Sequence, residues 1–174
     1  MHLDVERGLC EPSVALYKGT YYLTIRNDVK GYVTTSKDGL NYDAIKPWMF
    51  DDGTELGSYN TQQHWLTHSD GLFLVYTRRG AGNDDVFRNR APLFMAQVDP
   101  EKLVVVRATE KVLMPNTGAA FGNFGATAID ENESWVTDAE GVFGDALKPG
   151  VKARVLNARV IWSSPDRLAK AKSP

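Results

Sequence analysis

A glutamate and an arginine near the start of the chain are well placed to do chemistry together. Glu11 precedes one β-rich segment and Arg26 closes the next, so both would lie at the open end of one hairpin. A carboxylate in such a pair can act as acid or base, and a guanidinium can hold a substrate carboxylate through two parallel hydrogen bonds. A structural salt bridge at the strand end is the alternative interpretation.

His64, which directly precedes Trp65, is the second candidate for proton transfer. Imidazole titrates near neutral pH and can exchange protons with a substrate under ordinary conditions. The neighbouring indole ring could provide a flat surface on which a sugar stacks. A hydrogen-bonded core histidine beside a buried tryptophan is the alternative.

A long polar connection runs from Arg78 to Arg90 and contains two glycines, two aspartates and four arginines. Long loops on a rigid scaffold often carry binding residues. We therefore expect its arginines to contact a ligand: Arg78, Arg79, Arg88 and Arg90. A solvated loop without a ligand is the alternative.

The segments that must position these residues repeat along the chain. In residues 13–26 and again in residues 64–78, a turn glycine lies seven residues before the closing arginine, and a weaker third copy ends at Glu140. The copies begin about 50 to 60 residues apart, as in repeats of a four-stranded propeller blade. The segments are rich in β-branched and aromatic residues, and no long window shows helical periodicity.

This repeat predicts an all-β, β-propeller-like fold of about three four-stranded antiparallel blades. We expect one domain over residues 1–174, with blades near residues 11–50, 60–114 and 122–164. Three blades do not close a ring, because propellers have about four to eight. Either the chain is part of a longer protein, or a homodimer completes a six-bladed ring. A compact β-sandwich is the alternative fold.

Register within the repeat adds further candidates to the site. The first strand of each blade lines the propeller axis, so polar residues at equivalent strand ends should gather there, where burial is costly unless they are paired or used. Glu11, His64 and Asn123 precede or begin first strands, while Arg26, Arg78 and Glu140 end second strands.

Composition excludes several classes of partner. The net charge is -2, with 24% charged residues of both signs, which argues against nucleic acid or an anionic membrane surface. No apolar run approaches the roughly 18 residues that cross a bilayer, and no secretory signal is evident, so a cytoplasmic location is the default expectation. Three scattered histidines and the single Cys10 form no zinc pattern, and no calcium-loop spacing occurs, so we expect no metal and no cofactor.

Two stretches resemble sialidase-like propellers. The segment from Ser36 to Tyr42 is similar to a shortened Asp-box (BNR-repeat) turn, with tyrosine in place of the usual tryptophan. The segment from Glu11 to Arg26 resembles the sialidase order of glutamate, strand, turn glycine, strand and arginine. This resemblance implies that Glu11 polarises a nucleophile and that Arg26 belongs to a cluster that binds the substrate carboxylate. The tyrosine nucleophile of that family has no counterpart near Gly122.

The sequence therefore indicates a carbohydrate-active protein, resembling exo-glycosidases, that hydrolyses or binds a terminal sugar, acidic sugars included, at the propeller axis. Glu11 and His64 are the expected catalytic residues. The expected binding residues are Arg26, Arg78, Arg79, Arg88, Arg90, Trp65, Asn123 and Glu140. The alternatives are a non-catalytic carbohydrate-binding or protein-interaction module and an inactive propeller fragment.

Overall fold

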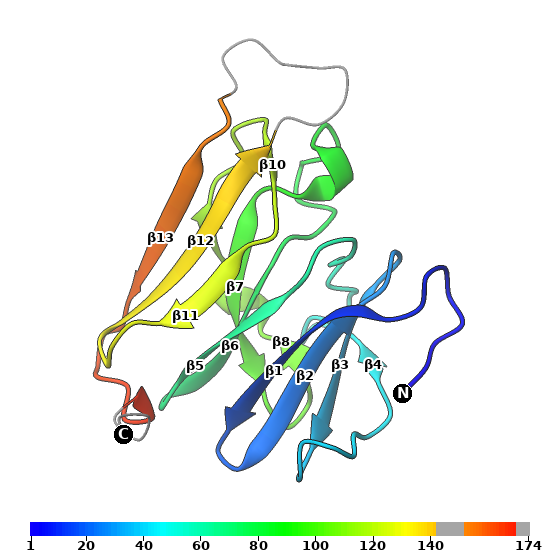
Figure 1. Ribbon diagram of the computed structural model, residues 1–174, viewed down its shortest axis with the longest axis vertical. Helices are drawn as coiled ribbons and strands as arrows, with labels where there is room; N and C mark the ends of the chain where they lie inside the picture. The colour runs from blue at the N-terminus through cyan, green and yellow to red at the C-terminus, as the bar shows by residue number, and fades with distance from the viewer. Residues whose placement is uncertain (142–151, 170–174) are drawn as a thin grey trace.

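The computed structural model describes residues 1–141 and 152–169, whose strands form three antiparallel sheets (Figure 1). The first sheet has the order β1 (Cys10–Tyr17), β2 (Thr20–Arg26), β3 (Gly31–Ser36) and β4 (Lys46–Pro47). The second has the order β5 (His64–His68), β6 (Gly71–Tyr76), β7 (Leu93–Asp99) and β8 (Val104–Val105), and β9 (Lys111–Met114) also pairs with β7.

The third sheet is built around β12 (Glu133–Gly141), which pairs with β10 (Ala120–Phe121) and β11 (Gly125–Ala128) and also with β13 (Val155–Ile161). Two single turns of 3-10 helix, η1 (Phe87–Asn89) and η2 (Arg107–Thr109), interrupt the connections of the second sheet. The prediction of an all-β chain with three antiparallel sheets of about four strands is confirmed.

The hairpins follow from local turn chemistry. Lys18 and Gly19 join β1 to β2, and both have positive φ angles, 47° and 77°, as a tight two-residue hairpin turn requires. Tyr17 therefore pairs with Thr20, and this register continues as far as Ser13 opposite Thr24. It then shifts by one residue, so that Cys10 lies opposite Arg26 at the far end. The turn and this shift together determine which residues meet at the open end of the hairpin.

The second sheet is buried on both of its faces. Along β6, Leu72, Leu74 and Tyr76 belong to a core shared with the first sheet, which also contains Tyr22 and Trp48. Val75, between them in sequence, belongs to a second core shared with Phe121 and Val136 of the third sheet. Because side chains alternate across a strand, β6 supplies both cores, and the three sheets pack face to face in series.

The two end sheets keep one face uncovered by the described residues. On β1, Val14 and Leu16 are 57% and 56% exposed, while Tyr17 is buried against the second sheet. On β13, Val155 and Ile161 are likewise exposed. Large apolar side chains on regular strands normally face a neighbouring layer.

The turn after β3 is closed by hydrogen bonds to the side chain of Asp38. The Asp38 carboxylate accepts the backbone N–H groups of Leu40 and Asn41, both at 2.8 Å, and the Ser36 hydroxyl donates to it at 2.9 Å. These donors hold the pKa of Asp38 well below its usual value, with the backbone N–H of Asn41 the largest cause. Gly39 has a φ of 76° at the tip. The turn is structural and lies outside the candidate site described below.

Replacing Leu74 with alanine should destabilise the protein strongly, because this fully buried side chain lies in the core between the first two sheets. We expect the free energy of unfolding to fall by about 3 kcal/mol, measured by urea denaturation. Leu40→Ala removes the same atoms from a side chain that is 85% exposed, and should change it by less than about 0.5 kcal/mol. Equal effects of the two changes would contradict the packing.

Candidate functional site

Three strands, one from each sheet, lie side by side and border a hollow of about 350 Å³. β1 contacts β5, and β5 contacts β11, and residues 13–16, 64–67 and 126–128 line the hollow. The three strands run in the same direction (Figure 1), so their starting ends lie at one end of the hollow. Polar residues that begin these strands or end their partners therefore meet there.

Glu11 lies at a break in the regular pairing of β1 with β2. The register between β1 and β2 shifts between Cys10 and Ser13, and Glu11 has a φ of 54°. A positive φ is unusual for a residue with a side chain, and bulges of this kind re-aim side chains at strand ends. The Glu11 side chain keeps 33% of its surface exposed, so a ligand can reach it. Backbone strain of this sort is concentrated at functional sites.

Arg26 fixes Glu11 at this position. The Nε atom of Arg26 donates to Oε2 of Glu11 at 2.8 Å, and the Nη1 atom of Arg26 donates to Oδ1 of Asp28 at 2.9 Å. Asp28 is bound from its other side by Arg7, at 2.7 Å from Nε. These bonds lower the pKa of Asp28 to about 2, with the Arg7 hydrogen bond the largest cause. The buried Arg26 guanidinium is thus charge-compensated by two carboxylates.

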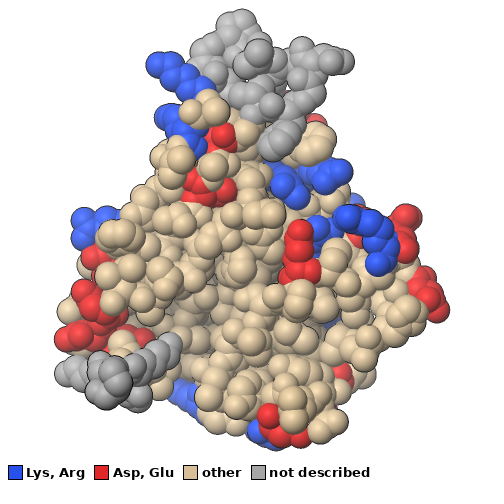
Figure 2. All heavy atoms as spheres, in the orientation of Figure 1, with Lys and Arg blue, Asp and Glu red and all other residues tan. Residues whose placement is uncertain are grey.

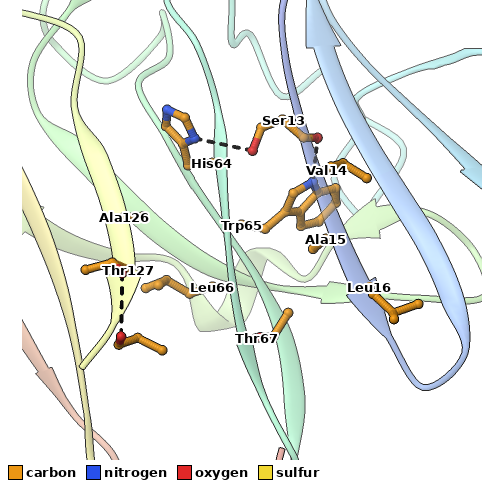
Figure 3. A pocket seen from close by; sticks show the side chains of 11 residues that line it. Ser13, Val14, Ala15, Leu16, His64, Trp65, Leu66, Thr67, Ala126 and Thr127 are labelled. Carbon is orange, nitrogen blue, oxygen red and sulfur yellow. Dashed lines mark hydrogen bonds between the residues drawn. The ribbon is translucent and has the colours of Figure 1, made fainter. Parts of the chain in front are cut away.

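His64 approaches Glu11 from the second sheet. Its Nδ1 lies 3.3 Å from the Ser13 hydroxyl on β1, and Figure 3 shows the two side chains facing each other across the gap between β1 and β5. The ring also packs edge-on against Phe124, with centroids 5.1 Å apart. Burial lowers the pKa of His64, and the nearby charge of Glu11 opposes this shift. A neutral imidazole at this position can accept a proton.

Arg90 brings a cation to the same end of the structure. Its NH2 donates to the backbone oxygen of Asn60 at 2.7 Å, but its buried Nε has no partner among the described residues. Burial lowers the pKa of Arg90, and Arg88 contributes in the same direction, while Glu11 and Asp138 oppose them. Arg90 therefore lies within electrostatic range of carboxylates from both the first and the third sheet.

Asp138 on β12 is the site residue that the sequence did not reveal. Its Oδ1 accepts the N–H groups of Gly122 at 3.1 Å and Ala139 at 2.7 Å, and its buried Oδ2 has no partner in the described structure. Burial raises the pKa of Asp138 to about 6, although these N–H groups and Arg90 oppose the rise. A carboxyl in this range can hold or release a proton near neutral pH.

Trp65 borders the hollow, but its ring is buried in the core. Trp65 is only 7% exposed and packs against Tyr22 and Trp48, so its ring offers no surface to a sugar. Its Nε1 donates to the backbone oxygen of Ser13 at 3.1 Å, which ties β5 to β1. Trp65 therefore belongs to the core, because β5 turns it toward the first sheet.

The arginines of the long loop also have internal partners. Arg78 donates to both carboxylate oxygens of Glu110, at 2.9 and 2.8 Å, and lies over the Phe94 ring. Arg79 bonds the backbone oxygen of Val29 and lies 4.3 Å from the Tyr59 ring centroid. They border a separate hollow together with Arg107, away from the one between β1, β5 and β11.

The remaining expected binding residues are Arg88, Asn123 and Glu140. Arg88 lies 4.9 Å from the ring centroid of its neighbour Phe87. Asn123 is exposed immediately before Phe124. Glu140 is paired with Arg154 at 2.6 Å, which lowers its pKa, so it acts within the third sheet. Of the expected residues, the structure brings Glu11, Arg26, His64 and Arg90 together.

Asp28 and Asp138 were not predicted as site residues, and they differ in how far the sequence alone could have identified them. Asp28 follows Arg26 by two residues in the turn before β3, and that proximity could have identified it. Asp138 shows only as one polar residue within a β-rich segment, and its burial depends on packing against the second sheet.

The surface around the hollow has few charges. Figure 2 shows uncharged atoms over much of the face formed by β1, β5 and β11, with Lys, Arg, Asp and Glu concentrated around its margins.

Among the described residues, no helix is long and apolar enough to cross a membrane.

Comparisons with known proteins give structural matches only. No family model and no curated protein sequence matches the chain. Among solved structures, it matches a GH43B protein of the xyloglucan PUL of Bacteroides ovatus with a TM-score of 0.55 and 15% identity, over 92% of this chain and 29% of that one. It also matches a xylan β-1,4-xylosidase from Bacillus halodurans C-125, with a TM-score of 0.56 and 13% identity, over 95% and 31%.

An α-L-arabinofuranosidase from Lactobacillus brevis gives a TM-score of 0.51 and 12% identity, over 88% of this chain and 51% of that one. The chain thus spans about a third to a half of these proteins. The likeness is one of fold: the three sheets correspond to part of the β-propeller of these glycosidase structures. The partial propeller is confirmed, but the sialidase assignment is not, because the matched propellers are of the GH43 type.

The unusual environment of Asp138 should appear in the pH dependence of stability. Its pKa rises from 3.8 when unfolded to about 6 when folded, so the folded state holds more protons between these values. The stabilising contribution of Asp138 to the free energy of unfolding is therefore fully present below the unfolded-state pKa of 3.8. It is lost as pH rises through the folded-state pKa of about 6. As pH rises across this interval, the free energy of unfolding of Asp138→Asn should rise relative to that of the wild type, because the amide does not titrate. Urea denaturation at several pH values measures this difference. A difference that does not vary with pH would contradict the burial of this carboxyl.

Proposed function

We propose that the end of the hollow where β1, β5 and β11 begin is a carbohydrate site that binds a terminal sugar and hydrolyses its glycosidic bond. The observation that carries this proposal is Glu11, a reachable carboxylate that Arg26 holds on a strained bulge, within electrostatic range of His64. Strain at an exposed carboxylate, stabilised by a buried arginine, has no evident role in holding the sheets together.

Glu11 acts in this proposal as the acid or base, and Arg26 positions it. Arg26 engages Oε2 of Glu11, which leaves Oε1 as the oxygen available to a ligand. His64 assists as a neutral imidazole, since its burial disfavours the charged form. Arg90, in the loop of the second sheet, provides positive charge that favours the Glu11 carboxylate.

A neutral sugar suits this site better than an acidic one. Arg26 is already compensated by Glu11 and Asp28, and Arg78 by Glu110, so neither is free to bind a substrate carboxylate. The matched structures include a xylosidase and an arabinofuranosidase, which supports terminal pentoses as the first substrate class to test.

A non-catalytic sugar-binding module is the second candidate function. The small share of the matched proteins that the chain covers, 29% and 31% for two of them, favours this candidate. A catalytic site would also need a second carboxyl group, because glycoside hydrolysis ordinarily uses two. Such a module would use the same surface and would show affinity without turnover.

Glu11→Gln should separate these candidates. We expect it to lower hydrolysis of nitrophenyl pentosides at least about a hundredfold, with pentose affinity changed less than about threefold, because the amide retains the shape and loses the proton chemistry. Glu133→Gln is the matched control, since Glu133 is also bound by an arginine, Arg159, outside the site. Full turnover in Glu11→Gln with normal binding would sink the catalytic assignment, and wild-type binding without turnover would favour the module.

We also propose that a second copy of the chain covers the exposed faces of the end sheets. Val14 and Leu16 on the first sheet, and Val155 and Ile161 on the third, are the apolar side chains that such a contact would bury. Light scattering coupled to size exclusion should give a dimer mass, and Leu16→Lys should shift it toward the monomer by placing charge in the contact. A monomer mass for the unaltered chain at micromolar concentration would contradict this pairing.

A further inference from the structure

A serine and a histidine face each other at the hollow, and the glycosidase proposal leaves the serine unused. Ser13 on β1 and His64 on β5 both line the hollow, and both residues are half-buried. Nδ1 of His64 lies 3.3 Å from the Ser13 hydroxyl, and Figure 3 shows the two groups pointing toward each other between the strands. A hydroxyl within reach of an imidazole, where a ligand can enter, is the arrangement of an activated serine nucleophile.

His64 is in the state that such a nucleophile requires. Burial lowers the pKa of His64, so the ring is neutral at neutral pH and Nδ1 can accept the proton of the Ser13 hydroxyl. The charge of Glu11 and a hydrogen bond to the Phe124 backbone act in the opposite direction. They stabilise the imidazolium that forms once the proton has moved, which is the task of the aspartate in a serine, histidine and aspartate triad.

The walls of the hollow determine which substrates fit beside this pair. Among the described residues that line the hollow there is no Asp, Glu, Lys or Arg, and the walls include Ala15, Ala126 and Ala128. A volume of about 350 Å³ suits a small molecule. A small neutral ester therefore fits, whereas a charged substrate would find no opposite charge on these walls.

The backbone next to Ser13 supplies a donor for the charge that develops during attack on an ester. Because Tyr17 and Thr20 pair across a two-residue turn, hydrogen-bonded and non-hydrogen-bonded pairs alternate along β1, and Val14 falls at a non-hydrogen-bonded pair. Its N–H therefore points away from β2, at the open edge of β1, and Val14 also lines the hollow. A backbone N–H of this kind can donate to the oxyanion of a tetrahedral intermediate.

We propose that Ser13 and His64 are the nucleophile and base of a second activity, the hydrolysis of short-chain esters of neutral alcohols. Ser13 Oγ attacks the carbonyl carbon while its proton passes to Nδ1 of His64. The bond between that carbon and the leaving alcohol oxygen then breaks as His64 gives the proton to this oxygen, and the acyl group stays on Ser13. Water next attacks the acyl group and gives a proton to His64, which returns it to Oγ as the carboxylic acid leaves.

This activity goes beyond the proposed glycosidase, because it breaks an ester bond and depends on Ser13. His64 takes part in both reactions, so only changes at Ser13 test the ester reaction separately. The two activities are measured with different substrates, p-nitrophenyl acetate for the ester reaction and nitrophenyl pentosides for the glycosidase.

The test combines labelling by a fluorophosphonate, which reacts with activated serines, with turnover of p-nitrophenyl acetate. Peptide mapping by mass spectrometry should locate the label on Ser13 in the wild type. Ser13→Ala should lose the label and lower kcat/KM for p-nitrophenyl acetate at least about a hundredfold, and His64→Gln should do the same because the base is lost. Thr67→Ala is the matched control, since it removes another hydroxyl from the same hollow, and should behave as the wild type does.

Ser13→Cys keeps the test decisive if Ser13→Ala disturbs the contact between β1 and β5. The thiol should still take the acetyl group from p-nitrophenyl acetate, because His64 can accept its proton as well. Hydroxylamine should then release this thioester, which intact-protein mass spectrometry can follow.

The outcomes separate this activity from the proposed function. A wild type that is not labelled at Ser13, or equal labelling and turnover in Ser13→Ala and wild type, would overturn the ester reaction and leave the Glu11 site standing. Labelling at Ser13 together with ester turnover, but without pentoside turnover, would support the ester reaction and overturn the glycosidase.

Discussion

Burial of both faces of the second sheet is the constraint on which the rest of the structure depends. Leu74 and Tyr76 pack toward the first sheet, and Val75 packs toward the third, so one strand supplies two cores. This arrangement fixes the order of the three sheets and brings their first strands side by side around the hollow. It also leaves the outer faces of the first and third sheets without a covering layer among the described residues.

Charge compensation then decides which residues remain available for a ligand. Arg26 is buried and Arg78 is half-buried, and carboxylates neutralise both, while Arg79 contacts a backbone oxygen and an aromatic ring. Such pairs are typical of strand ends that have to place a charge against a core. Within the described part of the chain, the buried Nε of Arg90 and the buried Oδ2 of Asp138 have no hydrogen-bond partner, and the Glu11 side chain keeps 33% of its surface exposed. The proposed function uses the exposed part of Glu11.

Much of the fold could be predicted from the sequence because the hairpins are locally encoded. The turn glycine at position 19 and the strand types on both sides of it were enough to place Glu11 and Arg26 together. The same reasoning failed for Arg78, although it occupies the equivalent position of the second repeat. Its partner, Glu110, lies 32 residues away and is brought to it by the return of the chain along β7. Trp65 and Asp138 depend on which face of a strand meets the next sheet, and this is a property of the packed molecule.

The central claim is that ligands bind where β1, β5 and β11 begin. Hydrogen exchange followed by mass spectrometry, with and without a saturating neutral pentose, tests that location directly. The account predicts slower exchange in peptides covering residues 9–13, 60–64 and 120–124, with the turn around Asp38 unchanged. Protection confined to the hollow bordered by Arg78, Arg79 and Arg107, or protection of the Asp38 turn alone, would contradict it.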